Sequence, residues 1–276
     1  MTKTLYISDL DGTLLNSHQQ ISETTKKILN RLIRERGLNF TVATARTPAT
    51  VVKILSGIDC RLPYVVMTGA AMWKEEIVNQ HYLQPTQVDK LLELCHKAGF
   101  NPFVYTHHGK GIETFHSEQR TDLEHRFIAA RSGSPYKKFT FTGRMPENAK
   151  QRVLLMFTTG DHAGLKAVYE EAKKIVPCTM TCSPDIYNNG VGILEVMAEG
   201  ASKAAAIREL ARETGANRIV VFGDSPNDLS MREVANYFVA PSNAADEVKS
   251  VADEVIGSND EDSVVHWIEH DVESQA

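Results

Sequence analysis

The stretch that decides the fold is LYISDLDGTLL, residues 5–15. A short apolar run rich in β-formers predicts a buried strand, and the run ends at two carboxylates, Asp9 and Asp11, followed by Gly12. Open α/β sheets bind ligands at the carboxyl ends of their strands, which is where both carboxylates would lie. Two carboxylates one residue apart can hold a hard divalent cation, and a free carboxylate can attack phosphorus. An ordinary strand followed by an Asp/Gly turn gives the same pattern, so the rest of the chain must decide between the two interpretations.

Composition indicates a soluble protein of one large or two ordinary domains. The chain has 276 residues, 42% of them hydrophobic and 24% charged, which is enough for a sizeable core. A net charge of −5 without a basic block argues against nucleic acid and membrane surfaces as partners. No apolar run reaches membrane-spanning length, and we expect no signal peptide because the folded pattern begins within the first residues.

The four cysteines indicate a reduced compartment. They form no CxxC pair, and a chain of this size has little need of disulfides. Two of them lie four residues apart and could suggest a metal site, but core or surface packing explains such a pair more simply. We therefore expect a cytoplasmic protein, and its oligomeric state stays open. The cysteines are Cys60, Cys95, Cys178 and Cys182.

The two ends of the chain have the alternation of a parallel sheet. Apolar runs and helical stripes follow one another, which predicts strands joined by right-handed crossovers. We therefore predict a Rossmann-like α/β core that is discontinuous in sequence, residues 1–83 and 189–276. The expected strands lie around 5–8, 40–43, 64–67, 193–197, 219–222 and 237–239, and the expected helices around 22–37, 51–55, 202–214, 244–251 and 262–270.

Residues 84–188 lose that alternation. Helices and pairs of short strands repeat there instead, which predicts an inserted α+β domain that acts as a lid. His107, His108 and His116 lie in or near the Gly-rich turn 107–111 and are interpreted as solvated, with a metal or phosphate contact left open. The expected helices lie around 88–99, 122–131 and 165–175, the strands around 102–105, 112–115, 153–158 and 179–187, and a loop around 132–136.

Polar groups suited to phosphate and metal gather in four loops that follow a strand or precede a helix. Lys203 stands in the first turn of a helix, where the helix dipole disfavours a cation by about 0.3–1 kcal/mol unless an anion lies nearby. A solvated lysine stem or an acidic helix cap explains each candidate singly. Their joint occurrence at one edge of the sheet indicates a phosphate and metal site. The candidates are Asp9, Asp11, Thr44 with the backbone N–H of Ala45, Lys203, Asp224 and Asp228.

The order and spacing of these motifs resemble the haloacid dehalogenase (HAD) superfamily, in its Cof-type branch (subclass IIB), over nearly the whole chain. The matching segments are DLDGTL at 9–14, ATAR at 43–46, GASK at 200–203, GDSPND at 223–228 and NA at 243–244. The resemblance implies a Rossmann-like parallel-sheet core with an inserted α+β cap of the C2B type. It also implies a Mg²⁺-dependent phosphatase that hydrolyses a small phosphorylated metabolite, a sugar phosphate, through an aspartyl-phosphate intermediate.

The resemblance also implies a role for each matched residue. Asp9 is expected to be the nucleophile and a metal ligand. Asp11 is expected to act as general acid and then base, and to bind the metal through its backbone carbonyl. The remaining expected residues are Asp224 as the third metal ligand, Thr44, Ala45, Lys203 and Asn227 as phosphate-binding groups, and Thr13 and Asp228 as side chains that support the metal ligands.

The chain departs from the family pattern at three small residues. Ala45 and Ala204 stand where glycine is common, and Thr68 stands where asparagine is common. All three are expected to line the pocket, so they bear on the substrate rather than on the chemistry.

Other functions use parts of the same pattern. A phosphotransferase or phosphomutase shares the phosphoaspartate but excludes water. A non-catalytic sensor would bind a phosphorylated metabolite and close its cap, and the presence of every catalytic residue argues against it. A metal-dependent glycosyltransferase can use a DxD pair, but it leaves Lys203 and Asp224 without a role.

Overall fold

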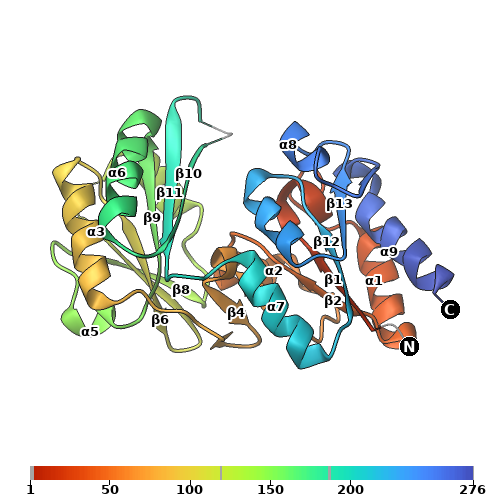
Figure 1. Ribbon diagram of the computed structural model, residues 1–276. Helices are drawn as coiled ribbons and strands as arrows, with labels where there is room; N and C mark the ends of the chain where they lie inside the picture. Colours follow the sequence, from red (N-terminus) through yellow and green to blue (C-terminus); the bar gives the residue numbers. More distant parts are fainter. Residues whose placement is uncertain (1–2, 119, 186–187, 276) are drawn as a thin grey trace. The chain divides into compact units, whose positions relative to one another are not determined.

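The computed structural model describes residues 3–118, 120–185 and 188–275. The chain forms two compact units (Figure 1). The first comprises Met1–Thr47, Val51–Lys74 and Ser202–Ala276, and the second Pro48–Thr50 and Glu75–Ala201. The second unit therefore extends beyond the predicted cap limits of 84 and 188 at both ends.

The first unit is built on a parallel sheet with the strand order β14-β13-β12-β1-β2. Its strand β1, which lies between β12 and β2, is buried along its whole length, because both faces of a parallel sheet are covered by helices. A parallel bridge from Ala43 to Val65 brings β3 beside β2, and β3 pairs antiparallel with β4. The strands are β1 (Thr4–Ser8), β2 (Asn39–Val42), β3 (Tyr64–Val66), β4 (Ala71–Trp73), β12 (Arg218–Phe222), β13 (Tyr237–Pro241) and β14 (Glu254–Ile256).

Helices cover both faces of this sheet. In Figure 1, α1 (Glu23–Arg36) and α9 (Ser263–Ser274) lie on one face and α7 (Lys203–Thr214) on the other. Two shorter helices, α2 (Pro48–Ile54) and α8 (Asp246–Lys249), and a 3-10 segment, Pro226–Glu233, complete the unit. The predicted Rossmann-like α/β core is confirmed.

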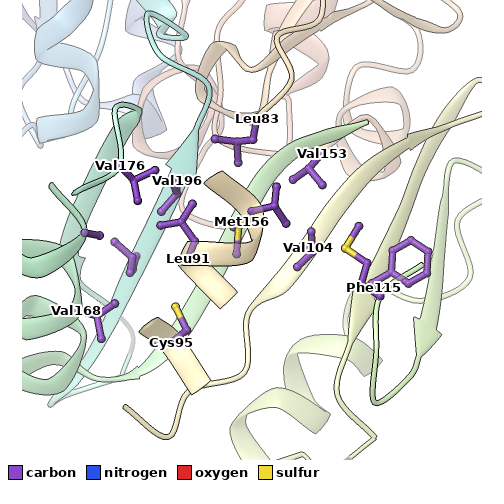
Figure 2. Packing of buried hydrophobic residues seen from close by; sticks show 14 of the residues in the cluster. Leu83, Leu91, Cys95, Val104, Phe115, Val153, Met156, Val168, Val176 and Val196 are labelled. Atoms are coloured by element: carbon purple, nitrogen blue, oxygen red, sulfur yellow. The ribbon is translucent and has the colours of Figure 1, made fainter. Parts of the chain in front are cut away.

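The second unit is an α+β domain around a sheet with the order β10-β11-β9-β6-β7-β8. Its strand pairs are antiparallel except for β7 and β8. One face packs on α3 (Pro85–Lys97) and α6 (His162–Ile175) through the apolar cluster of Figure 2, which includes Leu91, Val168, Met156 and Val196. The strands are β5 (Ile77–Val78), β6 (Phe103–His108), β7 (Gly111–His116), β8 (Lys137–Phe141), β9 (Val153–Asp161), β10 (Thr179–Pro184) and β11 (Val191–Met197), and the other helices are α4 (Asp122–Ala129) and α5 (Glu147–Lys150). The predicted inserted α+β cap is confirmed.

Two expectations for this region are wrong, and one strand was not predicted. Residues 193–197 do not resume the parallel sheet, because β11 lies antiparallel between β9 and β10 and continues the cap. The sequence analysis made no prediction for residues 137–141, which form β8. His116 is not solvated: it is 3% exposed, and its ring stacks on Phe103 with centroids 3.8 Å apart. Residues 186 and 187 of the strand region expected at 179–187 lie outside the described residues.

Two further observations concern the whole chain. All four cysteines carry free thiols. Within the part of the chain that the structure describes, no helix has the length and apolar character needed to cross a bilayer.

Candidate active site

A buried lysine joins two carboxylates at the carboxyl end of the parallel sheet. Lys203 begins α7 and is 0% exposed, and its Nζ lies 2.6 Å from Oδ1 of Asp9 and 2.6 Å from Oδ1 of Asp228. Asp9 follows β1 directly, and its backbone N–H donates to the carbonyl of Phe222 at the end of β12. The cation that is unfavourable at a helix N-terminus is therefore held there by two anions.

Asp228 is fixed from both sides. Its Oδ1 accepts from Lys203, and its Oδ2 accepts from the backbone N–H groups of Asp224 at 3.0 Å and Ser225 at 3.1 Å. These N–H groups belong to the loop between β12 and the helical segment that starts at Pro226, so Asp228 caps that segment. Its carboxylate is 0% exposed and holds both Lys203 and the loop that carries Asp224.

Asp224 lies against the turn that follows β1. Its Oδ1 accepts from the Thr13 hydroxyl at 3.0 Å. Gly12 has φ +76°, and a Cβ at this position would lie 2.3 Å from Asp224 Oδ2. Glycine is therefore needed at position 12 both for the backbone conformation and for the space that the Asp224 carboxylate occupies.

Burial and mutual repulsion perturb the acids of this site. Burial raises the pKa of Asp9 well above its usual value; Lys203 opposes the rise, and Asp228 and Asp224 add to it. Burial and the charge of Asp228 raise the pKa of Asp224 to about 6 against the hydrogen bond from Thr13. Burial alone lowers the pKa of Lys203, but Asp228 and Asp9 outweigh it and raise the pKa. Three carboxylates facing one ammonium leave the site short of positive charge.

A divalent cation fits this deficit. One oxygen each of Asp9, Asp224 and Asp228 lies within 4.8 Å of the other two. Asp9 and Asp224 each keep one oxygen, Oδ2, that accepts no hydrogen bond from another described residue, whereas both oxygens of Asp228 are engaged. Carboxylate oxygens are the ligands that Mg²⁺ prefers. Asp9 and Asp224 are therefore suited to hold the ion, and Asp228 to hold Lys203 and the Asp224 loop in place.

Thr44 follows β2 at the same edge of the sheet and is 1% exposed. Its Oγ1 accepts from the backbone N–H of Arg46 at 3.1 Å, which leaves the hydroxyl proton for another acceptor. Ala45 lies between them in the same loop. Asn227 is less closely integrated: it is exposed, and its Oδ1 accepts from the Ser225 hydroxyl at 2.9 Å.

Arg46 is a charged group of this site that the sequence analysis did not single out. Its Nε and Nη2 donate to the two oxygens of Asp11 at 2.6 and 2.5 Å, so the Asp11 carboxylate is held in a bidentate pair. Gln19 also accepts from Arg46 Nη2 at 3.1 Å. The signal in the sequence is the position of Arg46 two residues after Thr44, in a loop that the parallel topology places beside the one that follows β1.

Asn243 holds the same turn from another loop. Its Nδ2 donates to the carbonyl of Gly12 at 2.8 Å, and its Oδ1 accepts from the backbone N–H of Asn259 at 3.0 Å. The structure thus brings Asp9, Thr13, Lys203, Asp224 and Asp228 into one connected cluster. Asp11 and Thr44 adjoin Arg46, and Asn227 stays at the periphery.

Known proteins of similar length are similar to this chain in sequence. The profile of a family described as haloacid dehalogenase-like hydrolase matches residues 6–268. The 5-amino-6-(5-phospho-D-ribitylamino)uracil phosphatase YcsE of Bacillus subtilis is 27% identical over 95% of this chain and 93% of its own length. The pyridoxal phosphate phosphatase YbhA of Escherichia coli is 26% identical over 97% of this chain and 98% of its own length.

Solved structures share the fold. A haloacid dehalogenase-like hydrolase from Bacteroides thetaiotaomicron has a TM-score of 0.77, 25% identity and coverage of 98% of this chain and 99% of its own. The HAD subclass IIB sugar phosphatase BT4131 has a TM-score of 0.74 at 23% identity, with 98% of each chain covered, and shows a common fold. Because the family profile spans the chain from the first strand to the last helix, this protein belongs to the haloacid dehalogenase-like hydrolases.

Proposed function

We propose that this hydrolase is a cytoplasmic, Mg²⁺-dependent phosphatase that acts on a small phosphorylated metabolite through an aspartyl phosphate on Asp9. The observation that carries the proposal is the buried Lys203, which joins Asp9 and Asp228 beside the partly free carboxylate of Asp224. This arrangement supports the proposal, because a carboxylate suited to attack, a fixed cation and two oxygens suited to bind a metal lie in one cluster.

In the first step a carboxylate oxygen of Asp9 attacks phosphorus. Bound Mg²⁺ would offset the charge that keeps an anionic nucleophile and an anionic phosphate apart. Lys203 and the Thr44 hydroxyl are suited to bind the non-bridging phosphoryl oxygens as the bond to the leaving oxygen breaks. Asp11 donates a proton to that leaving oxygen, so the alcohol departs neutral.

In the second step water attacks phosphorus of the acyl phosphate. Asp11 accepts a proton from the water, the bond between phosphorus and the Asp9 oxygen breaks, and inorganic phosphate leaves. Both oxygens of Asp11 accept from Arg46 in the structure, so Asp11 must loosen at least one of these hydrogen bonds for each proton transfer. Arg46 thereby sets where the Asp11 carboxylate can reach.

We propose a sugar phosphate or a phosphorylated sugar-like chain as the substrate. The name of the Bacillus subtilis relative specifies a phosphate on a ribityl chain, which supports this class at 27% identity. The name of the Escherichia coli relative, which is 26% identical, specifies pyridoxal phosphate, so relatives of nearly the same identity differ in the group that leaves. Specificity therefore has to come from residues outside the Asp9 cluster, and the cap is the part of the chain proposed to supply them.

The test is phosphate release from a panel of phosphorylated metabolites, together with trapping of the enzyme-bound phosphoryl group. Asp9→Asn removes the proposed nucleophile, so no phosphoenzyme should form and release should stop. Asp11→Asn keeps the backbone carbonyl, and an aryl phosphate with a good leaving group needs little protonation. This variant is therefore expected to accumulate phosphoenzyme on Asp9, because the base that activates water is missing.

The mapped position of the phosphoryl group decides the assignment. A phosphoryl group on Asp11, or continued turnover by Asp9→Asn, contradicts the proposed roles. Phosphoryl transfer to a second metabolite without release of inorganic phosphate would make the enzyme a phosphotransferase or phosphomutase instead.

A further inference from the structure

The cap sheet has a second face, opposite the one that packs on α3 and α6. Side chains alternate along a strand, and Val104 and Phe115 point into the helix-covered cluster, so their neighbours Phe103, Tyr105 and His116 point to the other face. Aromatic rings dominate this face. Phe127 of α4 packs on it with ring centroids 4.7 Å from Phe103 and 4.9 Å from Phe157.

Lys137 is the charged group of this face that stands out. It is the first residue of β8 and is 6% exposed. Its Nζ lies 3.4 Å from the Tyr105 hydroxyl, 4.4 Å from the centroid of the Tyr105 ring and 4.7 Å from that of the Phe139 ring. No carboxylate of the described residues lies within ion-pair distance of this ammonium. A buried cation without an anion is strongly unfavourable.

The other buried lysines of the described chain are neutralised. Lys203 contacts Asp9 and Asp228, and Lys150 lies 2.5 Å from Asp89 and 2.8 Å from Glu147. Of these three buried lysines, Lys137 is the one whose ammonium lies against aromatic rings instead of carboxylates. Burial, followed by the charge of Arg131, lowers the pKa of Lys137 to about 7.

Arg131 brings a second cation to the same ring. Its guanidinium carbon lies 3.8 Å from the centroid of the Phe127 ring, and Lys137 Nζ lies 5.7 Å from that centroid. Arg131 is exposed, and Phe127 and Phe139 are partly exposed, so solvent reaches the edge of this group. Glu195 of β11 is the acidic residue whose charge acts on Tyr105. Two cations gathered on apolar walls are electrostatically complementary to a small anion.

We propose that Lys137 and Arg131, walled by Tyr105, Phe127 and Phe139, form an anion subsite on the cap that binds a carboxylate or phosphate group of a small molecule. This acid group belongs either to the phosphorylated substrate, a reading that rests on the proposed phosphatase function, or to a separate anionic metabolite. Both sources present the same chemistry to the two cations, and experiment distinguishes them.

The first arm tests the subsite without turnover. In an NMR experiment on protein labelled with ¹³C-lysine, the Cε resonance of Lys137 is identified as the one that is missing in Lys137→Met. The pH titration of this resonance is then compared between sodium sulfate and sodium chloride at equal ionic strength. Sulfate bound beside the ammonium is expected to raise the pKa of Lys137 by about 1, which corresponds to a tenfold higher proton affinity. Lys138 is the matched control: it is the next residue on the opposite face, paired with Glu113 at 2.8 Å, and its resonance should not respond. Equal titrations of Lys137 in sulfate and chloride would overturn the proposal.

The second arm identifies the source of the anion. In the Asp9→Asn background, which cannot turn substrate over, calorimetry compares 6-phosphogluconate with glucose 6-phosphate, which lacks the acid group, and with gluconate alone. If the anion is part of the substrate, the second acid group should tighten binding about tenfold, with the gain lost in Lys137→Met, kept in Lys138→Met and largely restored in Lys137→Arg. If the anion is a separate ligand, Lys137→Met should weaken the binding of gluconate alone and leave the difference between the two phosphates intact. If Lys137→Met changes neither, the anion subsite is wrong. Failure of the phosphatase proposal would show independently, as an absence of phosphate release from any substrate, and would leave the sulfate response unchanged.

Discussion

Asp224→Asn and Asp228→Asn are expected to shift stability in opposite directions, although both remove one negative charge from the same cluster. The oxygens of Asp228 accept from Lys203 on one side and from the backbone N–H groups of Asp224 and Ser225 on the other. An asparagine has one oxygen and one NH₂ group. In either orientation the NH₂ therefore faces a donor, either the ammonium or the two N–H groups.

The magnitude follows from the burial of these groups. Breaking one side of a fully buried ion pair destabilises a protein by about 3–5 kcal/mol, and Lys203 keeps Asp9 as a second partner, so we expect a loss of about 3 kcal/mol for Asp228→Asn. For Asp224→Asn the sign is reversed in metal-free protein. The folded state raises the pKa of Asp224 to about 6, so its ionised carboxylate destabilises the fold above that pH, and the contribution disappears below the ordinary aspartate value. The neutral amide, which can still accept from Thr13, should stabilise metal-free protein at pH 7.5 by on the order of 1–3 kcal/mol.

Urea unfolding at pH 7.5, with and without Mg²⁺, measures both effects through the transition midpoint. Mg²⁺ should raise the midpoint of the native protein, because an ion that binds only the folded state stabilises it. It should raise that of Asp224→Asn little, since a ligand is gone, and this variant should also lack phosphatase activity. If Asp228→Asn unfolds at the native midpoint, or if Asp224→Asn is less stable than the native protein without metal, the division between a structural and a metal-binding carboxylate is wrong.

Three further predictions address other parts of the molecule. Chelation with EDTA should abolish phosphate release and Mg²⁺ should restore it; full turnover in excess chelator would contradict the metal site. Gly12→Ala should lose activity, because its Cβ would displace the Asp224 carboxylate. Gly37→Ala is the control, since Gly37 also has a positive φ but nothing lies within 4 Å of its Cβ. This variant should lose about 1 kcal/mol of stability in a urea transition and keep its activity. Lys137→Met should stabilise the protein by about 2–4 kcal/mol more at pH 7 than at pH 10. A lysine whose pKa is lower in the folded than in the unfolded state destabilises the fold most at low pH, and this effect disappears as the pH rises through 10.5. Equal stability differences at the two pH values would contradict the buried charge.

The core and its cluster were predictable from sequence because their signals are local. The apolar run before Asp9 marks a buried strand, and the parallel topology then requires Asp9, Thr44 and Asp224 to meet at one edge. The membership of β11 could not be predicted in this way. Its sequence VGILEVM is apolar enough for either sheet, and only its pairing with β9 and β10 places it in the cap. The same limit explains His116, whose ring stacks on Phe103 of a neighbouring strand and lies 3.6 Å from Glu124 of α4, contacts that only the tertiary fold brings about.

Lys203 and Lys137 show how the same side chain acquires opposite properties from contacts that sequence does not reveal. The carboxylates of Asp9 and Asp228 raise the pKa of Lys203 against its burial, so its charge is permanent at any physiological pH. A permanent charge suits a group proposed to bind a phosphoryl oxygen in every turnover, since it needs no proton to arrive with the substrate. Lys137 has no such partner in the described chain, and its pKa near 7 makes its charge depend on what lies beside it. An anion that binds there would therefore bring a proton onto the lysine and gain an ion pair that the empty subsite lacks. Burying the unpaired Lys137 costs the empty fold free energy, and an anion that pairs with Lys137 can recover that free energy on binding. Lys137→Met should therefore raise the stability of the protein and lower its affinity for the anion.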